Sequence, residues 1–220
     1  MKKLKCFDII ISSVKDLFYP RHCIYCDTTV KNFKELSICA NCKSIRNYPH
    51  VVRDDRFLFT EAFGVLKYDG VVREAMLKFK FRGVKYYGYT FAERMSLYAE
   101  NFSYLKTAVM CCVPISKSRE REYNQTEVIA THLAKLVGNK CVSDLLYKVR
   151  DIKPLSTMNK AQRKTCIRGV FAVNPKYNLS GKDVVVIDDI FTSGTTANEC
   201  AKVLLAAGAK NVYIACACFD

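Results

Sequence analysis

Several features that would point to common protein classes are missing from this sequence. No apolar run is long enough to span a bilayer, which excludes a helical membrane protein. The first residues show no small-residue cleavage site, so a secretory signal is not expected. Histidine is scarce, with three residues, and none of them stands out as a general base.

Acidic residues are also scarce, and this gives the chain a basic balance. Lys and Arg number 35 against 21 Asp and Glu, so the formal net charge is +14. Such an excess favours polyanions through non-specific electrostatics. Half of the residues are hydrophobic, as in an ordinary globular protein, and the length allows one or two domains.

The most informative segment that is present lies near the C-terminus. The four apolar residues Val184–Ile187 run directly into Asp188 and Asp189. An all-apolar run is typical of a strand buried on both faces, as in a parallel sheet. Ligands of such sheets bind at the carboxyl ends of the strands. We therefore expect the two acids and the loop after them to line a site.

The loop after the acids has the composition of an anion site. Gly194 permits a tight turn, and a helix over Thr195–Ala207 would add unpaired N–H groups and the positive end of its dipole. Together with the hydroxyl side chains, these groups suit a phosphate monoester. The loop has no lysine and does not match G-x-x-x-x-G-K-[ST], which argues against a Walker-type ATPase. The residues assigned to the phosphate are Thr192, Ser193, Gly194, Thr195 and Thr196.

The two acids need a partner other than the phosphate. Ionised Asp188 and Asp189 can only accept hydrogen bonds, and a phosphate beside them would be repelled. A vicinal diol is a better partner, because each carboxylate can accept hydroxyl donors. The segment therefore fits a ribose 5-phosphate unit. The alternative is a buried strand followed by a helix that the acids cap.

Three further segments extend an alternating pattern of strands and helices. Ala108–Val113 and Asn211–Phe219 are apolar runs of strand length. Gln125–Val137 carries apolar residues at helical spacing and stops before Gly138, which can end a helix. The order strand, helix, strand, helix, strand predicts βαβ units and a doubly wound α/β sheet.

Two basic stretches interrupt this pattern. In the loop Ile115–Arg119, Lys117 and Arg119 could meet a diphosphate at the same edge of the sheet, and a solvated loop is the alternative. Residues 150–164 are basic and polar without clear periodicity until Val170–Val173. A solvated connector is one interpretation of that second stretch.

Four cysteines near the N-terminus have the spacing of a metal site. Cys23 and Cys26 form one C-x2-C pair, and Cys39 and Cys42 form another after twelve intervening residues. Two such pairs can complete the tetrahedral shell of one zinc ion, which leaves no open position and implies a structural role. Two disulfides are the alternative, and the missing secretory signal argues against them.

The N-terminal residues predict an amphipathic helix. We expect its apolar face to cover the core, with a membrane-surface helix as the alternative. The protein is accordingly expected in the cytoplasm, or at the inner face of the membrane. The apolar face consists of Leu4, Phe7, Ile11, Val14 and Phe18.

The middle of the chain predicts a turn and a further helix. Tyr68–Gly70 reads as the turn, and apolar residues at helical spacing follow over Val71–Phe79. From Lys78 to Tyr87, basic residues alternate with aromatic ones. This pattern suits an ordinary helix end with cations near the negative pole of the dipole, and it also suits a nucleic-acid surface.

The segment Val184–Thr196 resembles the diphosphoribose-binding motif of type I phosphoribosyltransferases. The resemblance implies the substrate 5-phosphoribosyl 1-diphosphate, bound with Mg²⁺. It assigns Asp188 and Asp189 to the ribose hydroxyls and residues 192–196 to the 5-phosphate. Some members bind the ligand only to regulate, so the motif indicates the ligand more strongly than turnover.

The same resemblance assigns roles to the two basic stretches. It implies that the loop with Lys117 and Arg119 meets the diphosphate. It also implies that a flexible loop within residues 150–164 closes over the site as a charged lid, which would exclude water and neutralise the leaving group.

From end to end the chain resembles the ComF family. This bacterial family is linked to natural competence, where it is thought to aid uptake of single-stranded DNA beside a helicase, or to an unidentified phosphoribosyl transfer. One departure is Glu122, which stands where the family usually has a glycine before the aromatic residue. The resemblance rests on the cysteine pairs after Phe18–Pro20, on Tyr68–Gly70, Lys78, Lys80, Val113–Pro114 and Asn124–Gln125, and on the diphosphoribose loop.

These patterns predict an α/β fold with a type I phosphoribosyltransferase-like parallel sheet flanked by helices and a small N-terminal zinc ribbon. We expect residues 1–56 to hold the helix and ribbon, and residues 57–220 the phosphoribosyltransferase-like domain. The expected function is phosphoribosyl transfer linked to competence, with Asp188 and Asp189 as catalytic acids. The alternative is a non-catalytic protein that binds single-stranded DNA or a competence helicase.

Overall fold

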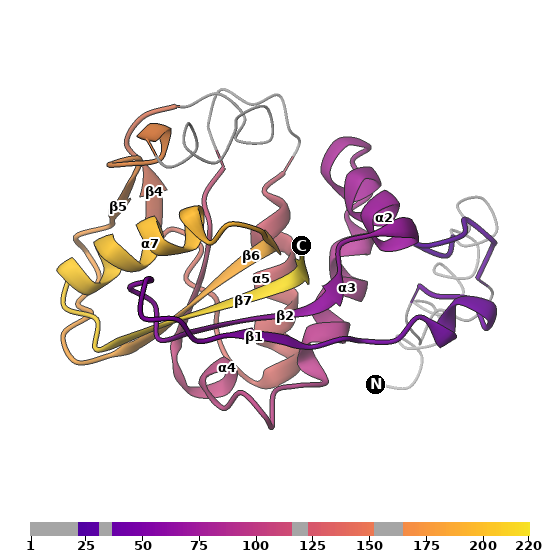
Figure 1. The fold of residues 1–220 in the computed structure, drawn as a ribbon, viewed down its shortest axis with the longest axis horizontal. Helices are drawn as coiled ribbons and strands as arrows, with labels where there is room; N and C mark the ends of the chain where they lie inside the picture. The colour runs from indigo at the N-terminus through magenta and orange to yellow at the C-terminus, as the bar shows by residue number, and fades with distance from the viewer. Residues whose placement is uncertain (1–21, 31–36, 116–122, 152–164) are drawn as a thin grey trace, which may run out of the picture. The chain divides into compact units, whose positions relative to one another are not determined.

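The computed structural model describes residues 22–30, 37–115, 123–151 and 165–220 (Figure 1). The chain divides into two compact units, residues 1–46 and 47–220, which are described separately. Within the described ranges, no helix has the length and apolar character needed to cross a membrane. The amphipathic helix expected at the N-terminus lies outside these ranges.

The described residues of the first unit form two tight turns, each of which holds a cysteine pair. In the first, the backbone N–H of Asp27 donates to the Cys23 carbonyl over 3.0 Å, and Asp27 has a φ of 65°. In the second, the N–H of Cys42 donates to the Cys39 carbonyl over 3.1 Å at the short 3-10 helix η1 (Asn41–Ser44). The buried apolar residues described in this unit are Cys23, Ile24, Tyr25 and Ile38.

The second unit contains a five-stranded sheet. Neighbouring strands are parallel except at one edge, where β1 runs antiparallel to β2. This confirms the predicted α/β fold with a parallel sheet. Across the sheet the strands are β1 (His50–Val52), β2 (Glu61–Lys67), β7 (Asn211–Phe219), β6 (Asp183–Phe191) and β3 (Val109–Cys112).

Helices cover both faces of this sheet (Figure 1). On one face, Cys200 and Leu204 of α7 pack in a core with Val184 and Val186 of β6. Val185, which alternates with them, is equally buried, so it faces the side on which α3 and α5 pack together. Burial on both faces explains the all-apolar run. The helices are α2 (Gly70–Phe81), α3 (Tyr86–Ser96), α4 (Tyr104–Thr107), α5 (Gln125–Val137) and α7 (Thr195–Ala206).

The predicted elements lie close to the observed ones. Strand β7 and helix α5 have the predicted bounds, and Gly138 after α5 adopts a φ of 74°. The strand predicted over Ala108–Val113 loses one residue at each end, and the helix predicted from Thr195 ends one residue early. Local apolar periodicity and end signals therefore specify these elements well.

Two short strands are not apparent in the sequence. Strand β1 pairs with β2 and therefore belongs to the second unit, which begins at Asn47. The sequence suggests a division ten residues later, after residue 56. Strand β4 (Leu146–Lys148) pairs antiparallel with β5 (Phe171–Val173) as a separate two-stranded sheet. Three residues carry too little periodicity to identify a strand, so pairing partners decide these elements.

Candidate functional site

Strand β6 continues through the two acids. Asp188 pairs with Cys216 of β7, and the ladder extends to Phe191, which pairs with Phe219. The sequence alone suggests that the acids follow the strand, because the apolar run stops at Ile187. Pairing with β7 extends the strand, since backbone hydrogen bonds do not require apolar side chains. The acids therefore belong to a paired strand close to its carboxyl end.

A short loop and a helix start follow β6. Gly194 has a φ of 70° and is the N-cap of α7, which places Thr195 and Thr196 in the first turn of the helix. Within the described part of the chain, no side chain caps this end, so its first N–H groups keep their donors for another acceptor. The hydroxyls of Ser193 and Thr195 lie 2.8 Å apart. Backbone donors, hydroxyls and the positive helix end form an arrangement suited to an anion.

Aromatic rings pack against this loop. A Cβ added to Gly194 would lie 2.8 Å from the ring of Phe57. Phe57 stacks on Phe59 with centroids 4.7 Å apart, and Phe59 meets Phe191 edge-on at 6.0 Å. The segment before β2 therefore packs closely on the loop after β6. The sequence does not indicate this contact, because the two segments are far apart in the chain.

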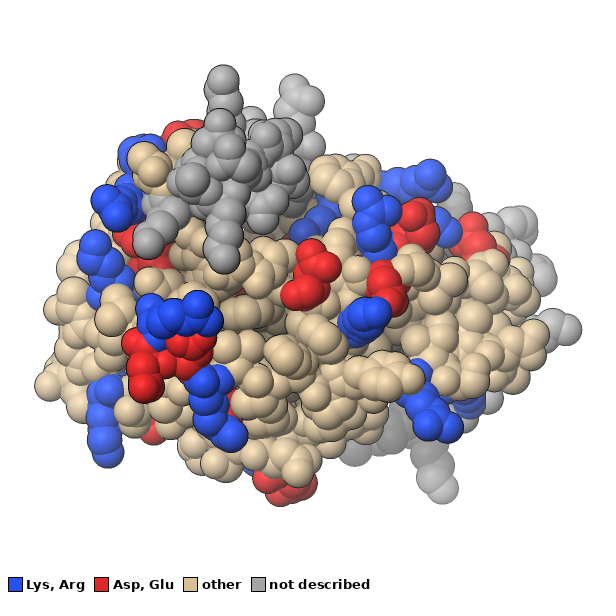
Figure 2. Space-filling view, in the orientation of Figure 1, with Lys and Arg blue, Asp and Glu red and all other residues tan. Residues whose placement is uncertain are grey.

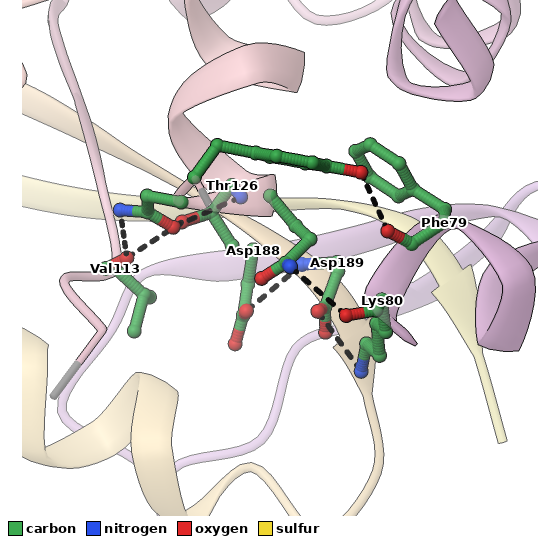
Figure 3. A network of polar contacts seen from close by, with 9 residues as sticks. Phe79, Lys80, Val113, Thr126, Asp188 and Asp189 are labelled. Carbon is green, nitrogen blue, oxygen red and sulfur yellow. Dashed lines mark hydrogen bonds and ion pairs between the residues drawn. The ribbon is translucent and has the colours of Figure 1, made fainter. Parts of the chain in front are cut away.

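Each acid has one oxygen held by the protein. Asp188 Oδ1 accepts the backbone N–H of Asp189 over 2.8 Å, and Asp189 Oδ2 lies 2.9 Å from Lys80 Nζ (Figure 3). The two carboxylates extend in the same direction from β6 in Figure 3. Asp188 Oδ2 and Asp189 Oδ1 have no hydrogen-bond donor among the described residues. One acceptor on each acid is thus available to a ligand.

The charges of this site are coupled. Burial raises the pKa of Asp188 from 3.8 to about 7, and the neighbouring Asp189 carboxylate adds to this rise. The Asp189 N–H and then the cations of Lys80 and Lys148 oppose it. Burial lowers the pKa of Lys80, but the attraction of Asp189 and Asp188 outweighs burial, so the net direction is upward. Lys80 therefore stays charged, and Asp188 titrates near neutrality.

Lys80 is a site residue that the sequence pattern does not identify. The pattern favours an ordinary helix end, and Lys80 indeed lies in the last turn of α2. The Tyr123 hydroxyl donates to the Phe79 carbonyl over 2.6 Å, and Gln125 Nε2 donates to the Lys80 carbonyl over 3.2 Å. These bonds satisfy carbonyls that a helix end leaves unpaired, and they join α2 to the start of α5. The shared ComF pattern of Lys80 and Asn124–Gln125 was the available signal.

The end of β3 is also joined to the start of α5. The Val113 carbonyl accepts Thr126 Oγ1 over 2.6 Å and Asn124 Nδ2 over 3.2 Å, while Asn124 Oδ1 caps the helix by accepting the Thr126 N–H (Figure 3). These bonds fix both flanks of the loop that the sequence assigns to a diphosphate. Lys117 and Arg119 lie outside the described residues, and their role stays a prediction.

The second basic stretch is held where it leaves and rejoins the fold. Arg150 Nη2 donates to the carbonyls of Cys166 and Arg168 over 2.9 and 2.8 Å. Both flanks therefore lie beside the β4–β5 pair. Residues 152–164, which include most of the expected lid, lie outside the described part of the chain, and the lid stays a prediction.

The four N-terminal cysteines surround one point. The Sγ atoms of Cys23, Cys26, Cys39 and Cys42 all lie within 4.8 Å of one another, and those of Cys26 and Cys39 are 3.4 Å apart. All four are free thiols, which disagrees with two disulfides. Sulfurs bonded at about 2.3 Å to a tetrahedral zinc would be roughly 3.8 Å apart, so the four fit a single ion.

Comparison with known proteins agrees with this picture. Residues 83–220 match the phosphoribosyl transferase domain. The chain is 28% identical to competence protein ComFC of Streptococcus pneumoniae, over 86% of this chain and 84% of that protein. It is 29% identical to the DNA utilization protein YhgH of Salmonella typhi, over 48% of this chain. The match covers 47% of that protein, so the chain spans about half the length of this relative.

Solved structures show weaker similarity. Glutamine phosphoribosylpyrophosphate amidotransferase from B. subtilis gives a TM-score of 0.38 at 22% identity, over 59% of this chain and 26% of that one. A hypoxanthine phosphoribosyltransferase from Staphylococcus aureus gives 0.36 at 18%, over 58% and 62%. The assignment rests instead on the domain match, which includes α5, β6, α7 and β7. The chain therefore belongs to the phosphoribosyl transferase domain family, and the similarity to ComFC confirms that it is a ComF-like member.

Proposed function

We propose that this chain binds 5-phosphoribosyl 1-diphosphate, as its Mg²⁺ complex, beside the carboxyl end of β6. Asp188 and Asp189 accept the ribose hydroxyls, and residues 192–196 donate to the 5-phosphate. The observation that carries the proposal is the pair of acids with one oxygen held and one available on each. Two neighbouring acceptors of this kind suit the two hydroxyls of a vicinal diol.

The reaction that fits this ligand is phosphoribosyl transfer to a nucleophile. The bond from C1 of the ribose to the diphosphate oxygen breaks, and the nucleophile forms a new bond to C1. Positive charge develops on the ribose, and the departing diphosphate carries the electron pair of the broken bond. Positioning and charge neutralisation supply most of the catalysis, and we assign Lys117 and Arg119 to the diphosphate.

Binding and turnover are tested separately. Calorimetry with the ligand and Mg²⁺ should show binding by the full chain and a loss of binding in the double variant Asp188→Asn, Asp189→Asn. Asp183→Asn, at the other end of β6, is the matched control and should bind as the unchanged protein does. Labelled ligand and a metabolite pool then report transfer or diphosphate release. Binding with no turnover for any acceptor would contradict the enzyme but not the binding site.

We also propose that the four cysteines hold a structural zinc ion. Thiolate ligands at C-x2-C spacing are typical of structural zinc, and four of them close the coordination shell to substrates. What supports this is the convergence of the four sulfurs in a unit whose described residues bury few apolar side chains. The ion would supply folding energy that so small a core lacks.

A second candidate function is binding of single-stranded nucleic acid, and one surface favours it. Phe81, the last residue of α2, is 67% exposed, and the exposed Arg82 and Lys85 follow it in the chain. An accessible ring next to cations can stack a base while the cations meet the backbone. The face shown in Figure 2 mixes basic and acidic side chains, so the net charge of +14 does not form one continuous basic surface there.

The test of this second function is the salt dependence of binding. Affinity for a single-stranded oligonucleotide should fall steeply as salt rises, because bound cations release counterions. The variant Phe81→Ala with Arg82→Ala should weaken binding, whereas Lys176→Ala should not. A flat salt response, or no binding at low salt, would contradict a nucleic-acid surface. Links to competence and to a helicase partner are proposals that follow from the ComF resemblance.

A further inference from the structure

We propose that Lys80 is a positioning residue for the acid pair, which it holds in the geometry and charge state that a ribose diol requires. The inference rests on the proposed function, because the diol is its ligand. Lys80 has no direct role in bond making here. It acts through Asp189, whose Oδ2 it engages at 2.9 Å.

The ion pair between Lys80 and Asp189 is better shielded from water than the other ion pairs of the described residues. The side chains of Lys80 and Asp189 are 18% and 15% exposed, whereas every other ion pair between described residues has at least one side chain more than one third exposed. Shielding from water strengthens the attraction between the charges. An exposed pair would contribute little, but this one can fix the orientation of a carboxylate.

The backbone that carries Lys80 is fixed independently of the acids. Tyr123 binds the Phe79 carbonyl and Gln125 binds the Lys80 carbonyl, so two consecutive carbonyls at the end of α2 are held by the start of α5 (Figure 3). A long, flexible lysine side chain normally samples many rotamers. Here the backbone of Lys80 is held by hydrogen bonds and its ammonium is paired with Asp189. Both contacts limit the rotamers of the side chain, so Lys80 is a rigid support for the carboxylate.

This support has two consequences for the acids. Because Lys80 occupies Oδ2 of Asp189, Oδ1 is the oxygen that can accept a hydroxyl. The positive charge of Lys80 also offsets the negative charge of one of the two adjacent carboxylates. Without it, their mutual repulsion would favour protonation of one of them. Among the described residues, the charged and titratable groups that face the acids include Lys80 of α2, Lys148 of β4, Tyr68 before α2, Cys200 of α7, and Cys216 and Cys218 of β7.

The first experiment needs no ligand. Carboxyl ¹³C NMR titration of the full chain should show that Lys80→Met raises the pKa of Asp188 by about one unit, since a nearby cation is lost. Lys80→Arg should restore the titration of the unchanged protein. Lys78→Met removes the same charge from the same helix end and is the matched control, because Lys78 is not among the largest causes of the Asp188 shift. An unaltered Asp188 titration in Lys80→Met would overturn the proposal.

The second experiment measures binding of the Mg²⁺–diphosphoribose complex against pH. Lys80→Met should bind at least tenfold more weakly at pH 7.5 and recover part of this loss at pH 9, while Lys80→Arg binds as the unchanged protein does. A purely structural lysine would alter stability without moving the pH profile, and that result would also overturn the proposal. Failure of the unchanged protein to bind the ligand would reject the proposed function, and the titration would still decide whether Lys80 controls the acids.

Discussion

Single residues at this site are constrained by backbone conformation and by neighbours. Gly194 has a φ of 70°, a backbone conformation that residues with a side chain rarely adopt. A Cβ at this position would also lie 2.8 Å from the Phe57 ring. Gly181 has the same φ, but nothing lies within 4 Å of its added Cβ. The two glycines therefore separate the cost of the conformation from the cost of the contact.

We expect Gly194→Ala to lower the free energy of unfolding more than Gly181→Ala. Gly181→Ala should cost on the order of 1 kcal/mol for the left-handed backbone, and Gly194→Ala roughly 1–3 kcal/mol more for the displaced ring. Urea unfolding of both variants measures the difference. Equal losses would show that the Phe57 ring moves away at no cost.

The raised pKa of Asp188 makes a second prediction at this scale. Folding raises this pKa from 3.8 to about 7, so between these values the native state binds a proton that the unfolded state has released. The free energy of unfolding therefore falls as pH rises from about 4 to about 7, and the full penalty persists above 7. Below about pH 4 both states are protonated and the penalty is absent.

Asp188→Asn should consequently stabilise the protein at pH 8, by on the order of 2 kcal/mol, and have little effect near pH 4. Asparagine keeps an oxygen that can accept the Asp189 N–H. Urea unfolding across this pH range is the measurement. Asp144→Asn is the control, because the Lys176 and Tyr177 partners lower the pKa of Asp144. Loss of the Asp144 carboxylate should therefore not stabilise the protein. The stabilised variant should bind the ligand less well. In that case, the buried Asp188 carboxylate lowers stability but is needed for ligand binding.

Among the elements, the junction of α2 with α5 matters most to the site. Helix α2 ends where Tyr123 and Gln125 engage its last carbonyls, and α5 begins where Asn124 caps it. The same start of α5 binds the carbonyl at the end of β3. This junction therefore holds the backbone of Lys80 and both flanks of the predicted diphosphate loop, and Lys80 in turn engages Asp189.

We expect Tyr123→Phe to lower the free energy of unfolding by about 0.5–1.5 kcal/mol, because the Phe79 carbonyl loses its hydroxyl donor. It should also weaken ligand binding, since the anchor of Lys80 is loosened. Thermal and urea unfolding measure the first effect and calorimetry the second. Tyr147→Phe removes the same hydroxyl from a side chain that is 43% exposed and should change neither. Equal effects of the two substitutions would contradict the anchoring role.

On the scale of the whole molecule, the chain consists of two units that are stabilised differently. Residues 47–220 have an extensive apolar core on the sheet, whereas the described residues of the first unit bury few apolar side chains. A small unit of this kind usually needs a metal or disulfides to fold. Its four cysteines are free thiols that converge on one point, so a metal is the consistent choice.

Removal of the zinc ion proposed for this cluster should therefore unfold the first unit alone. After treatment with a chelator, hydrogen exchange should accelerate in residues 22–30 and 37–46, while β6 and β7 stay protected. Cobalt substitution should give the absorption of tetrahedral thiolate coordination, and Cys26→Ser should weaken it. Cys166→Ser, outside the cluster, is the control. Equal acceleration in β6 would show that the two units do not fold separately.

Elements with local signals are specified by the amino-acid sequence alone. Apolar runs and helix-ending glycines indicate β7, α5 and most of β6 and α7, and the C-x2-C spacing indicates the cysteine cluster. Only the tertiary structure brought Lys80 to Asp189, placed Phe57 on Gly194 and paired β1 with β2. These contacts join residues far apart in the chain. The sequence around each of these residues is also compatible with an ordinary helix end or loop. Periodicity reports which face of an element is buried, but packing decides which distant side chain meets it.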